Sequence, residues 1–379
     1  MIPSAEREIS EHGAMLRALE LAASGVRGAN PLVGAVVLDP SGRVIGEGAH
    51  NGAGTPHAEP SALTDARSRG HDVDGGTMVV TLEPCSHTGR TGPCCEAVSA
   101  AGIRRVVYAA TDTNAEAAGG AAWLRSHGVE CVGGKLAAAA AGLNPRWVRS
   151  MAEGRPFVTL KTAGTLDGRV AAPDGTSQWI TGPEARSDGH TIRARADAVL
   201  VGTGTVLADD PRLTARTESS DRQPLRVVMG LRRPAADAAV RGPGFLHLAT
   251  RDVGAALDQL MQAGVRHLMV EGGPTIAGAF LQAGVVDEIF SYVAPIILGD
   301  GKPLIPPLGI STLTAASRWR LDPDGGAAVQ QLGADLRLHL RPDDTADGPE
   351  PPAVSTQPAT QAPPTPSASR DQESPCSQE

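Results

Sequence analysis

The chain has 379 residues, a net charge of −8 and 41% apolar residues, which suits about two domains with full hydrophobic cores. The acidic balance argues against a protein built mainly to hold nucleic acid, and no stretch approaches the roughly 20 apolar residues that cross a bilayer. The five cysteines are an odd number, and three of them, Cys85, Cys94 and Cys95, cluster in one motif, which argues against a disulfide framework. We therefore expect a cytoplasmic protein without membrane or nucleic-acid partners.

Helix and strand signals alternate along the first part of the chain. Apolar residues at helical spacing predict helices over 5–24, 59–69, 93–101 and 121–127. Short apolar runs predict strands over 33–38, 43–48, 77–82 and 104–109, with a turn at residues 39–42 between the first two. This alternation predicts a layered α/β sandwich.

A second α/β segment begins near Pro156. Its predicted strands cover 157–161, 198–202, 225–229, 267–270 and 288–293, and residues 273–281 are predicted to be a loop entering a helix. An alanine-rich helix is predicted to end at Asn144-Pro145-Arg146. From about Arg341, polar residues and proline dominate, so that segment cannot bury enough apolar surface to fold. We therefore expect a domain over 1–147, a second over 155–341 and a disordered tail over 342–379.

Two short motifs in the first segment carry recognisable chemistry. His57 and Glu59 open a predicted helix, Cys85 follows a predicted strand, and Cys94 lies at the start of the next helix. One imidazole and two thiolates give Zn²⁺ three protein ligands and leave the fourth position to water. The Glu59 carboxylate is then near enough to move that water's proton. This is the pattern of zinc deaminases that act on nucleobases, with more residues between the cysteines than usual.

Other interpretations of these residues stay open. The cysteines could be inert core residues, or the zinc could be structural, with Cys95 or His87 as a fourth ligand. Spacing alone does not decide whether Cys94 or Cys95 binds the metal. A structural zinc leaves Glu59 without a role, and three motifs at the ends of predicted elements favour a catalytic site.

The motifs together resemble the bifunctional deaminase/reductase family of riboflavin biosynthesis over about residues 10–340. The resemblance lies in residues 30–34, 57–59 and 81–95 of the first half, and in 160–169, 177–181, 207–214 and 270–275 of the second. It implies a three-layer α/β/α zinc-dependent domain of the cytidine-deaminase type, followed by a dihydrofolate-reductase-like α/β domain. It also implies two reactions on a phosphorylated pyrimidine. Zinc-dependent hydrolysis would deaminate 2,5-diamino-6-ribosylamino-4(3H)-pyrimidinone 5′-phosphate, and NADPH would then reduce the ribosyl group to ribityl.

The same resemblance implies roles for single residues. The zinc ligands would be His57, Cys85 and Cys94, with Glu59 as the catalytic proton shuttle. The deaminase substrate would contact Asn30, His50, His87 and Arg90. NADPH would contact Ala163, Trp179, Thr205, Asp209, Gly273, Pro274, Thr275, Ile276, Ala277, Gly278 and Ala279. The reductase substrate would contact Ser177, Arg193, Leu213, Arg216 and Glu271.

Elementary physics agrees with part of this assignment. A helix that starts after Gly272-Gly273 offers backbone N–H groups and a positive dipole end to a phosphate. Arg193 and Arg216 could clamp the substrate's 5′-phosphate with forked hydrogen bonds. Without the resemblance these signals are weak, because Trp179 could be a core residue and both arginines could be surface charges. No proton donor for the reduction stands out, and Asp209 is the residue that we name.

Two departures from the family pattern affect the second half. Many relatives have Asp-Ser where this chain has Gly230-Leu231, so a hydroxyl contact to the cofactor would be lost. The stretch 232–264 is short, and we expect it to lack one strand–helix element. These departures motivate a second hypothesis, a deaminase whose other domain only binds nucleotide or mediates association. A third hypothesis is a non-catalytic zinc-binding assembly protein. We expect a homo-oligomer under the leading hypothesis.

Overall fold

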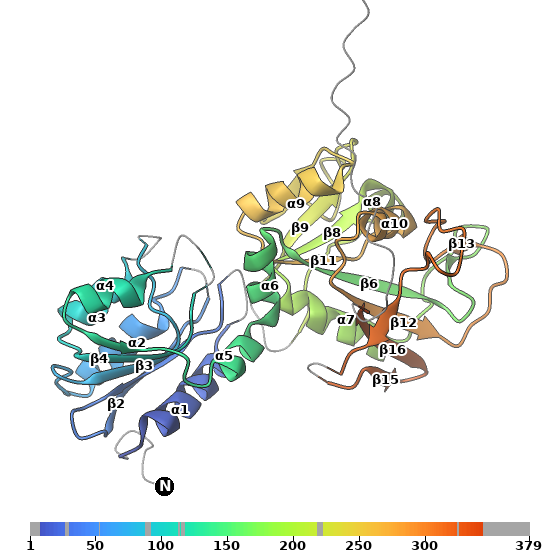
Figure 1. The fold of residues 1–379 in the computed structure, drawn as a ribbon. Coiled ribbons are helices and arrows are strands. Elements are labelled where there is room, and N and C mark those ends of the chain that lie inside the picture. Colours follow the sequence, from blue (N-terminus) through green and yellow to red (C-terminus); the bar gives the residue numbers. More distant parts are fainter. Residues whose placement is uncertain are drawn as a thin grey trace, which may run out of the picture.

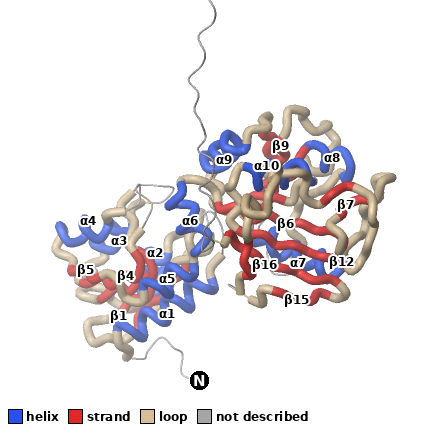
Figure 2. The backbone as a smooth tube through the Cα atoms, turned by 45° about the vertical axis from the view of Figure 1, so that its right-hand side comes forward, coloured by secondary structure: helices blue, strands red, loops and turns tan. Residues whose placement is uncertain are grey.

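The computed structural model describes residues 8–26, 30–52, 54–87, 92–112, 114, 118–217, 223–323 and 326–343. Within these ranges the strands form a five-stranded sheet, a nine-stranded sheet and a two-stranded ribbon. Figures 1 and 2 show the two large sheets side by side, each covered by helices. The α/β class predicted from the sequence is confirmed. Arg90 and all but the first two residues of the predicted tail lie outside the described residues.

The first half is built around the five-stranded sheet, whose strand order is β2-β1-β3-β4-β5. Strand β1 pairs antiparallel with β2 and β3, whereas β3, β4 and β5 are parallel. Its elements are α1 (Glu11–Ser24), β1 (Gly34–Leu38), β2 (Val44–Ala49), α2 (Ala58–Ser68), β3 (Thr77–Leu82), α3 (Cys94–Ala100), β4 (Arg105–Ala110), α4 (Gly120–Ser126), β5 (Glu130–Val132) and α5 (Ala137–Leu143). The predicted helix over 5–24 starts later, because the Ser10 side chain caps it by accepting from the Gly13 N–H.

Helices cover both faces of this sheet, which gives the expected three layers. Helices α2, α3 and α4 bury one face, and α1 and α5 bury the other. At Gly48 of β2, a Cβ atom would lie 2.4 Å from the Ala58 carbonyl oxygen, so only glycine lets α2 come this close. This contact fixes the start of α2, where His57 and Glu59 lie.

The second half is built around the nine-stranded sheet, whose order is β10-β9-β8-β11-β6-β12-β16-β14, with β15 also paired to β16. The strands from β10 to β12 are parallel, and β16, β14 and β15 are antiparallel. Its elements are β6 (Phe157–Thr165), β7 (Arg169–Ala171), α7 (Pro183–Arg195), β8 (Ala198–Gly202), α8 (Thr203–Asp209), β9 (Leu225–Met229), β10 (Phe245–Leu248), α9 (Val253–Gln262), β11 (His267–Val270), α10 (Pro274–Gln282), β12 (Glu288–Ala294), β13 (Lys302–Pro303), β14 (Trp319–Leu321), β15 (Val329–Leu332) and β16 (Asp335–Pro342).

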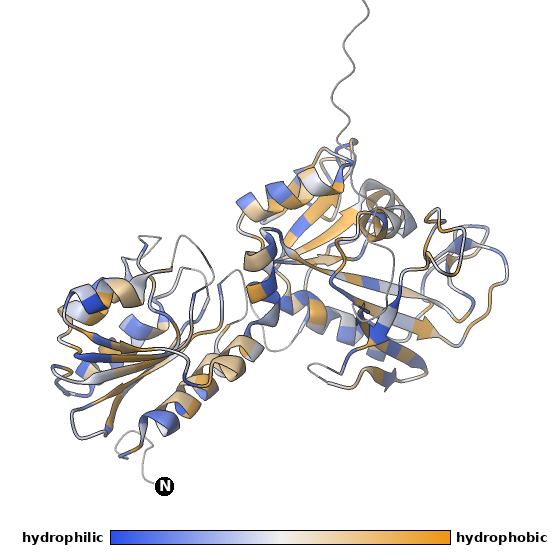
Figure 3. Cartoon of the chain, in the orientation of Figure 1, coloured by the Kyte–Doolittle hydropathy of each residue, from blue (hydrophilic) through white to orange (hydrophobic). Residues whose placement is uncertain are grey.

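The stretch 232–264 holds one strand–helix element, formed by β10 and α9, and β10 extends the parallel sheet beyond β9. Helix α9 packs with α10 on one face of the sheet, and α7 and α8 pack on the other. Figure 3 shows apolar residues concentrated along the central strands of both large sheets. Parallel strands buried on both faces require such continuous apolar runs.

The two halves are joined by α6 (Pro145–Glu153), a helix that we did not predict. The alanine-rich helix does end at Leu143, but Pro145 begins a new helix instead of a loop, since proline suits the first helical turn. Asn144 bonds the backbone of Leu32 in the first half through two hydrogen bonds of 2.7 and 2.9 Å. Arg146 forms a double ion pair, at 3.0 and 2.9 Å, with the fully buried Glu288 of the second half. Two residues at the start of α6, Asn144 and Arg146, therefore anchor the helix to both halves of the chain.

His267, under this junction, is expected to make the protein less stable in acid. Burial and then the Arg146 charge lower its pKa from 6.5 to about 4. The folded histidine therefore stays neutral while the unfolded chain takes up a proton below about pH 6.5. A pKa lowered by this amount corresponds to roughly 3 kcal/mol of unfolding free energy, lost as the pH falls from about 6.5 to 4. Thermal melts of wild type and His267→Gln across this range should show a flatter profile for the variant. If the melting temperatures of wild type and variant change equally with pH, the prediction is wrong. The control is His127→Gln, because His127 is exposed.

Candidate active sites

The first candidate site forms where three element ends meet. His57 is the residue before α2, Cys85 follows β3 by three residues, and Cys94 is the first residue of α3. The loop after β3 is held by Glu83, a buried carboxylate that accepts from the backbone N–H of Ala121 at 3.0 Å. We had not singled out Glu83, although a charged residue inside an otherwise apolar strand end is a recognisable signal.

The three donor atoms of His57, Cys85 and Cys94 all lie within 4.8 Å of one another. The His57 Nδ1 atom is 3.1 Å from the Cys94 sulfur and 3.6 Å from the Cys85 sulfur. Zinc bonds of about 2.0–2.3 Å in tetrahedral geometry place neighbouring donors about 3.5 Å apart. The residues present therefore fit a zinc ion held by one imidazole nitrogen and two sulfurs.

The surroundings of this cluster shift its ionisation. Hydrogen bonds from the Cys94 thiol, from His57 and from the Cys94 backbone N–H lower the pKa of Cys85, so its thiolate is favoured. Glu59 is only 4% exposed, and burial raises its pKa to about 7. A carboxyl group in this range can both accept and release a proton near neutral pH.

The two adjacent cysteines have different surroundings. The Cys94 sulfur faces the cluster, whereas Cys95 is buried in the apolar core beneath α3. Among the described residues, neither Cys95 nor His87 joins the group of His, Cys and acidic residues that could hold a metal. The fourth ligand of a closed structural site is therefore missing from the part of the chain that the structure describes.

Replacing Cys94 with serine is expected to abolish stoichiometric zinc binding, whereas Cys95→Ala should keep about one zinc per chain. The reason is that only the Cys94 sulfur lies with the other two donors, while Cys95 packs in the core. The zinc content of both variants is measured after dialysis by mass spectrometry of the metal. A Cys94→Ser protein that retains its zinc would contradict the assignment. Far-ultraviolet circular dichroism shows whether each variant is folded.

Two of the expected deaminase substrate residues lie next to the cluster. The Asn30 side-chain nitrogen is 2.9 Å from His50 Nε2, and the His50 ring contacts the His57 ring edge-on at 5.2 Å between centroids. His87 follows Cys85 by two residues, and its Nδ1 atom is buried without a hydrogen-bond partner in the described part of the chain. A buried, unsatisfied ring nitrogen is suited to receive a polar ligand.

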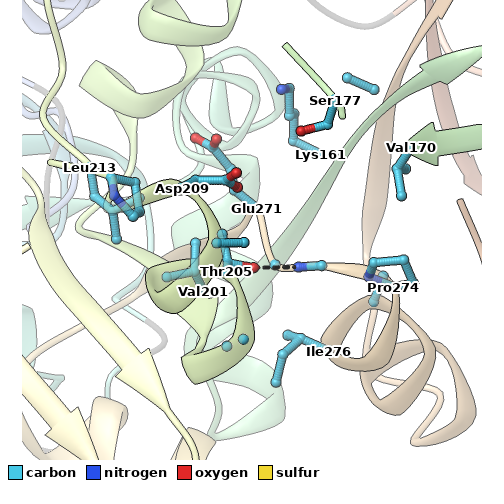
Figure 4. Close-up of a pocket in the computed structure, with 18 of the residues that line it drawn as sticks. Lys161, Val170, Ser177, Val201, Thr205, Asp209, Leu213, Glu271, Pro274 and Ile276 are labelled. Atoms are coloured by element: carbon cyan, nitrogen blue, oxygen red, sulfur yellow. Dashed lines mark hydrogen bonds between the residues drawn. The ribbon is translucent and has the colours of Figure 1, made fainter. Parts of the chain in front are cut away.

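The second candidate site is a cavity of about 1720 Å³ in the nine-stranded half. Its wall is formed by the middle of β6, by the carboxyl ends of β8, β9 and β11, by α7 and α8, by the start of α10, and by residues 175–181 (Figure 4). Ligands of open parallel sheets bind at the carboxyl ends of the strands, which is where this cavity lies. The volume is ample for a dinucleotide and a second small molecule.

The expected cofactor residues lie on this wall with one exception. Those that line the cavity are Ala163, Trp179, Thr205, Asp209, Gly273, Pro274, Thr275, Ile276, Ala277 and Ala279. Gly278 does not, because it faces Pro306, whose ring carbon would lie 2.5 Å from a Cβ atom there. Trp179 is not a core residue, since it is 68% exposed with the Arg186 guanidinium 4.4 Å from its ring centroid.

The start of α10 offers fewer free amides than the sequence suggests. The Gly273 N–H donates to the Thr205 hydroxyl at 3.1 Å, as Figure 4 shows, and Pro274 has no N–H. The Ile276 N–H donates back to the Gly273 carbonyl. Within the described residues, the first turn of α10 therefore keeps mainly the Thr275 amide for a phosphate oxygen.

All five expected reductase substrate residues, Ser177, Arg193, Leu213, Arg216 and Glu271, line the same cavity. The Leu213 side chain is buried in the core and its backbone has φ 53°, so its backbone is the part that can face a ligand. Arg216 lies 2.9 Å from His190 Nε2.

Arg193, one of the two arginines predicted to clamp a phosphate, is paired with an acidic residue in the structure. Its guanidinium forms a double ion pair with Glu271, one bond of which is 2.7 Å, and donates to the Thr214 carbonyl at 3.1 Å. Burial opposes the ionisation of Glu271, but the Arg193 charge outweighs it and keeps the pKa of Glu271 low. The pair is therefore a fixed, nearly neutral element of the cavity wall.

Lys161 also lines the cavity, and we had not assigned it a role. It sits on central strand β6 with its ammonium group 5.4 Å from the centre of the Tyr292 ring. Burial lowers its pKa, which the Glu271 charge only partly offsets. A lysine inside a buried parallel strand is the signal that could have identified it, because charged residues are rarely buried without a purpose.

Comparisons with known proteins agree with these two sites. Residues 9–110 match the model of the cytidine and deoxycytidylate deaminase zinc-binding region, and residues 156–325 match that of the RibD C-terminal domain. Fold and matches together define a two-domain enzyme that joins a zinc-binding deaminase to a reductase. No helix among the described residues has the length and apolar character needed to cross a membrane.

Individual relatives extend over nearly the whole enzyme. The riboflavin biosynthesis protein RibD of Mycobacterium tuberculosis is 45% identical over 82% of this chain and 90% of its own length. That of Escherichia coli is 38% identical over 86% and 98%. The structure of Acinetobacter baumannii RibD superposes with a TM-score of 0.77 at 36% identity, over 88% of this chain and 99% of that one. This chain belongs to the RibD family, the bifunctional deaminases and reductases of riboflavin biosynthesis.

Proposed function

We propose that the two reactions take place at the two sites described above, on the substrate 2,5-diamino-6-ribosylamino-4(3H)-pyrimidinone 5′-phosphate and its deaminated product. A Thermotoga maritima relative, 32% identical with a TM-score of 0.71, is named as a diaminohydroxyphosphoribosylaminopyrimidine deaminase and 5-amino-6-(5-phosphoribosylamino)uracil reductase. The observation that carries the proposal is the convergence of three metal-ligand atoms within 4.8 Å, in a domain separate from the large cavity.

At the first site, His57, Cys85 and Cys94 would hold zinc, which when bound would supply an activated water with a pKa of about 7. Glu59 would accept a proton from the attacking water and give one to the nitrogen that leaves as ammonia. Its burial and its pKa of about 7 support this double role. Asn30, His50, His87 and Arg90 are proposed to hold the substrate, supported by the contact of the Asn30–His50 pair with His57.

At the second site, we propose that NADPH supplies the hydride for reduction of the ribosyl group. We propose that NADPH contacts the ten expected cofactor residues that line the cavity. Gly278, the remaining expected residue, is proposed to contribute as part of helix α10. The substrate end is proposed at Ser177, Arg216 and the backbone of Leu213, with the Arg193–Glu271 pair as its fixed wall. Hydride given by NADPH to the carbon of the C=N bond in the ring-opened sugar would leave an electron pair on the nitrogen, and that nitrogen would need a proton. Lys161 is the proposed donor, because its lowered pKa eases proton release and it faces the substrate end.

Two further proposals concern organisation. We propose one domain over 1–147, a second over 155–341 and a tail over 342–379. The position of α6 between the two sheets supports the division between the domains. We also propose a homo-oligomer, and light scattering on the purified chain tests it.

One preparation tests the whole assignment. Given the aminopyrimidine substrate and NADPH, it should release ammonia and oxidise one NADPH for each turnover, seen as loss of absorbance at 340 nm. Ammonia release without that loss would favour a deaminase whose second domain lacks reductase activity. No ammonia release from zinc-loaded protein would reject the deaminase site.

A further inference from the structure

Two arginines leave the same end of the second sheet on neighbouring strands. In the parallel pair of β9 and β10, Met229 lies opposite Leu248. Arg232 follows Met229 by three residues, and Arg251 follows Leu248 by three. Because parallel strands in register end together, both arginines emerge at the carboxyl edge of the sheet. Both line the large cavity.

The backbone that carries Arg232 is firmly held. The Gly230 N–H donates to the Leu248 carbonyl at 3.0 Å, and the Gly230 carbonyl lies 2.8 Å from His247 Nε2. The Thr203 hydroxyl donates to the Arg232 carbonyl at 3.4 Å. Gly230 has φ 143°, and a Cβ atom there would lie 2.4 Å from the Thr203 hydroxyl oxygen. The turn after β9 is therefore fixed to β10 and to the start of α8.

The charges of this pair are not used elsewhere in the described structure. Two nearby arginines, Arg226 and Arg241, donate to backbone carbonyls of the 234–243 loop. By contrast, the guanidinium groups of Arg232 and Arg251 make no hydrogen bond or ion pair with any residue that the structure describes, and both are exposed. The side chain of Leu231, which lies between β9 and Arg232, has no polar group that could bind a ligand.

We infer that Arg232 and Arg251 bind the phosphate on the 2′ position of an adenosine ribose, and thereby make this enzyme prefer NADPH to NADH. The inference rests on the proposed function, in which the cavity holds a nicotinamide dinucleotide. The two dinucleotides differ only by this phosphate, which is a dianion near neutral pH. Forked guanidinium hydrogen bonds suit a phosphate monoester, and an arginine near the ribose serves this role in other dinucleotide sites. The substrate's own phosphate is assigned to Arg216.

Calorimetric titration of the full-length protein separates these phosphates. The probes are NADPH, NADH, 2′,5′-ADP, 5′-AMP and ribose 5-phosphate. Arg232→Gln and Arg251→Gln should each weaken NADPH and 2′,5′-ADP by roughly 10- to 100-fold, the range of a charged hydrogen bond. Binding of NADH and 5′-AMP should change by less than about twofold, because they lack the phosphate. Arg233→Gln is the matched control, since Arg233 is the next residue, is exposed, and does not line the cavity.

Each other result has a distinct meaning. If the double variant still prefers 2′,5′-ADP to 5′-AMP as wild type does, the arginines do not bind this phosphate and the inference is wrong. It is equally wrong if wild type binds NADPH and NADH with equal affinity, although the nucleotide cavity then stands. Loss of ribose 5-phosphate binding with 2′,5′-ADP unchanged would assign the pair to the substrate. If neither dinucleotide binds wild type, the proposed function of the cavity fails first.

Discussion

Replacing Glu59 with glutamine is expected to slow ammonia release by about 10²- to 10⁴-fold, the usual contribution of a general acid–base group. The amide has nearly the same shape as the carboxyl group but cannot take up or return a proton. Glu59 is buried beside the metal-ligand cluster, and its pKa of about 7 suits proton transfer in both directions. A coupled ammonia assay on the full-length protein measures the effect.

Two controls make this result specific. Zinc content should stay at about one per chain, because Glu59 is not a member of the ligand cluster. NADPH oxidation with substrate that has already been deaminated should keep the wild-type rate, since the second site lies in the other domain. Wild-type ammonia release by Glu59→Gln would remove the proposed proton shuttle. If the wild-type chain also releases no ammonia, the result instead supports the third hypothesis, a non-catalytic zinc-binding assembly protein.

Replacing Lys161 with methionine is expected to lower the rate of NADPH oxidation by about 10²- to 10⁴-fold. Methionine keeps the unbranched shape and can stay packed on the Tyr292 ring, but it carries no proton. The lysine stands at the substrate end of the cavity, and burial lowers its pKa, so proton release is easier than from an exposed lysine. Single-turnover loss of absorbance at 340 nm with saturating NADPH measures this step.

The interpretation depends on what stays unchanged. NADPH affinity and ammonia release by Lys161→Met should remain within a fewfold of wild type. Lys302→Met is the matched control, because Lys302 also lines the cavity but is exposed. Asp209 is the competing donor, and burial raises its pKa. A large loss in Asp209→Asn together with normal reduction by Lys161→Met would transfer the role to Asp209.

Local patterns in the sequence were sufficient for much of this description. The alternation of helix and strand periods gave the α/β class, and the strand over 77–82 has the same limits in the structure. The His57, Cys85 and Cys94 motifs were recognisable because each stands at the end of an element, where a short turn directs side chains toward one edge of the sheet. The prediction that β-strand signals follow residue 156 was also confirmed.

Long-range contacts decided the rest. Whether Cys94 or Cys95 faces His57 depends on how α3 packs, and adjacent helical residues point in different directions. The ion pair of Arg193 with Glu271, 78 residues away, is likewise set by tertiary packing.

The sequence by itself determined many of the elements and which residue types stand at their ends, because those properties depend on neighbours a few residues away. The tertiary structure alone decided which charges remain available. Arg193 of α7 is paired with Glu271 at the end of β11, whereas Arg232 and Arg251 come together only because β9 and β10 lie in parallel register. Pairing between distant residues is set by the packing of the whole domain, and no local pattern encodes it.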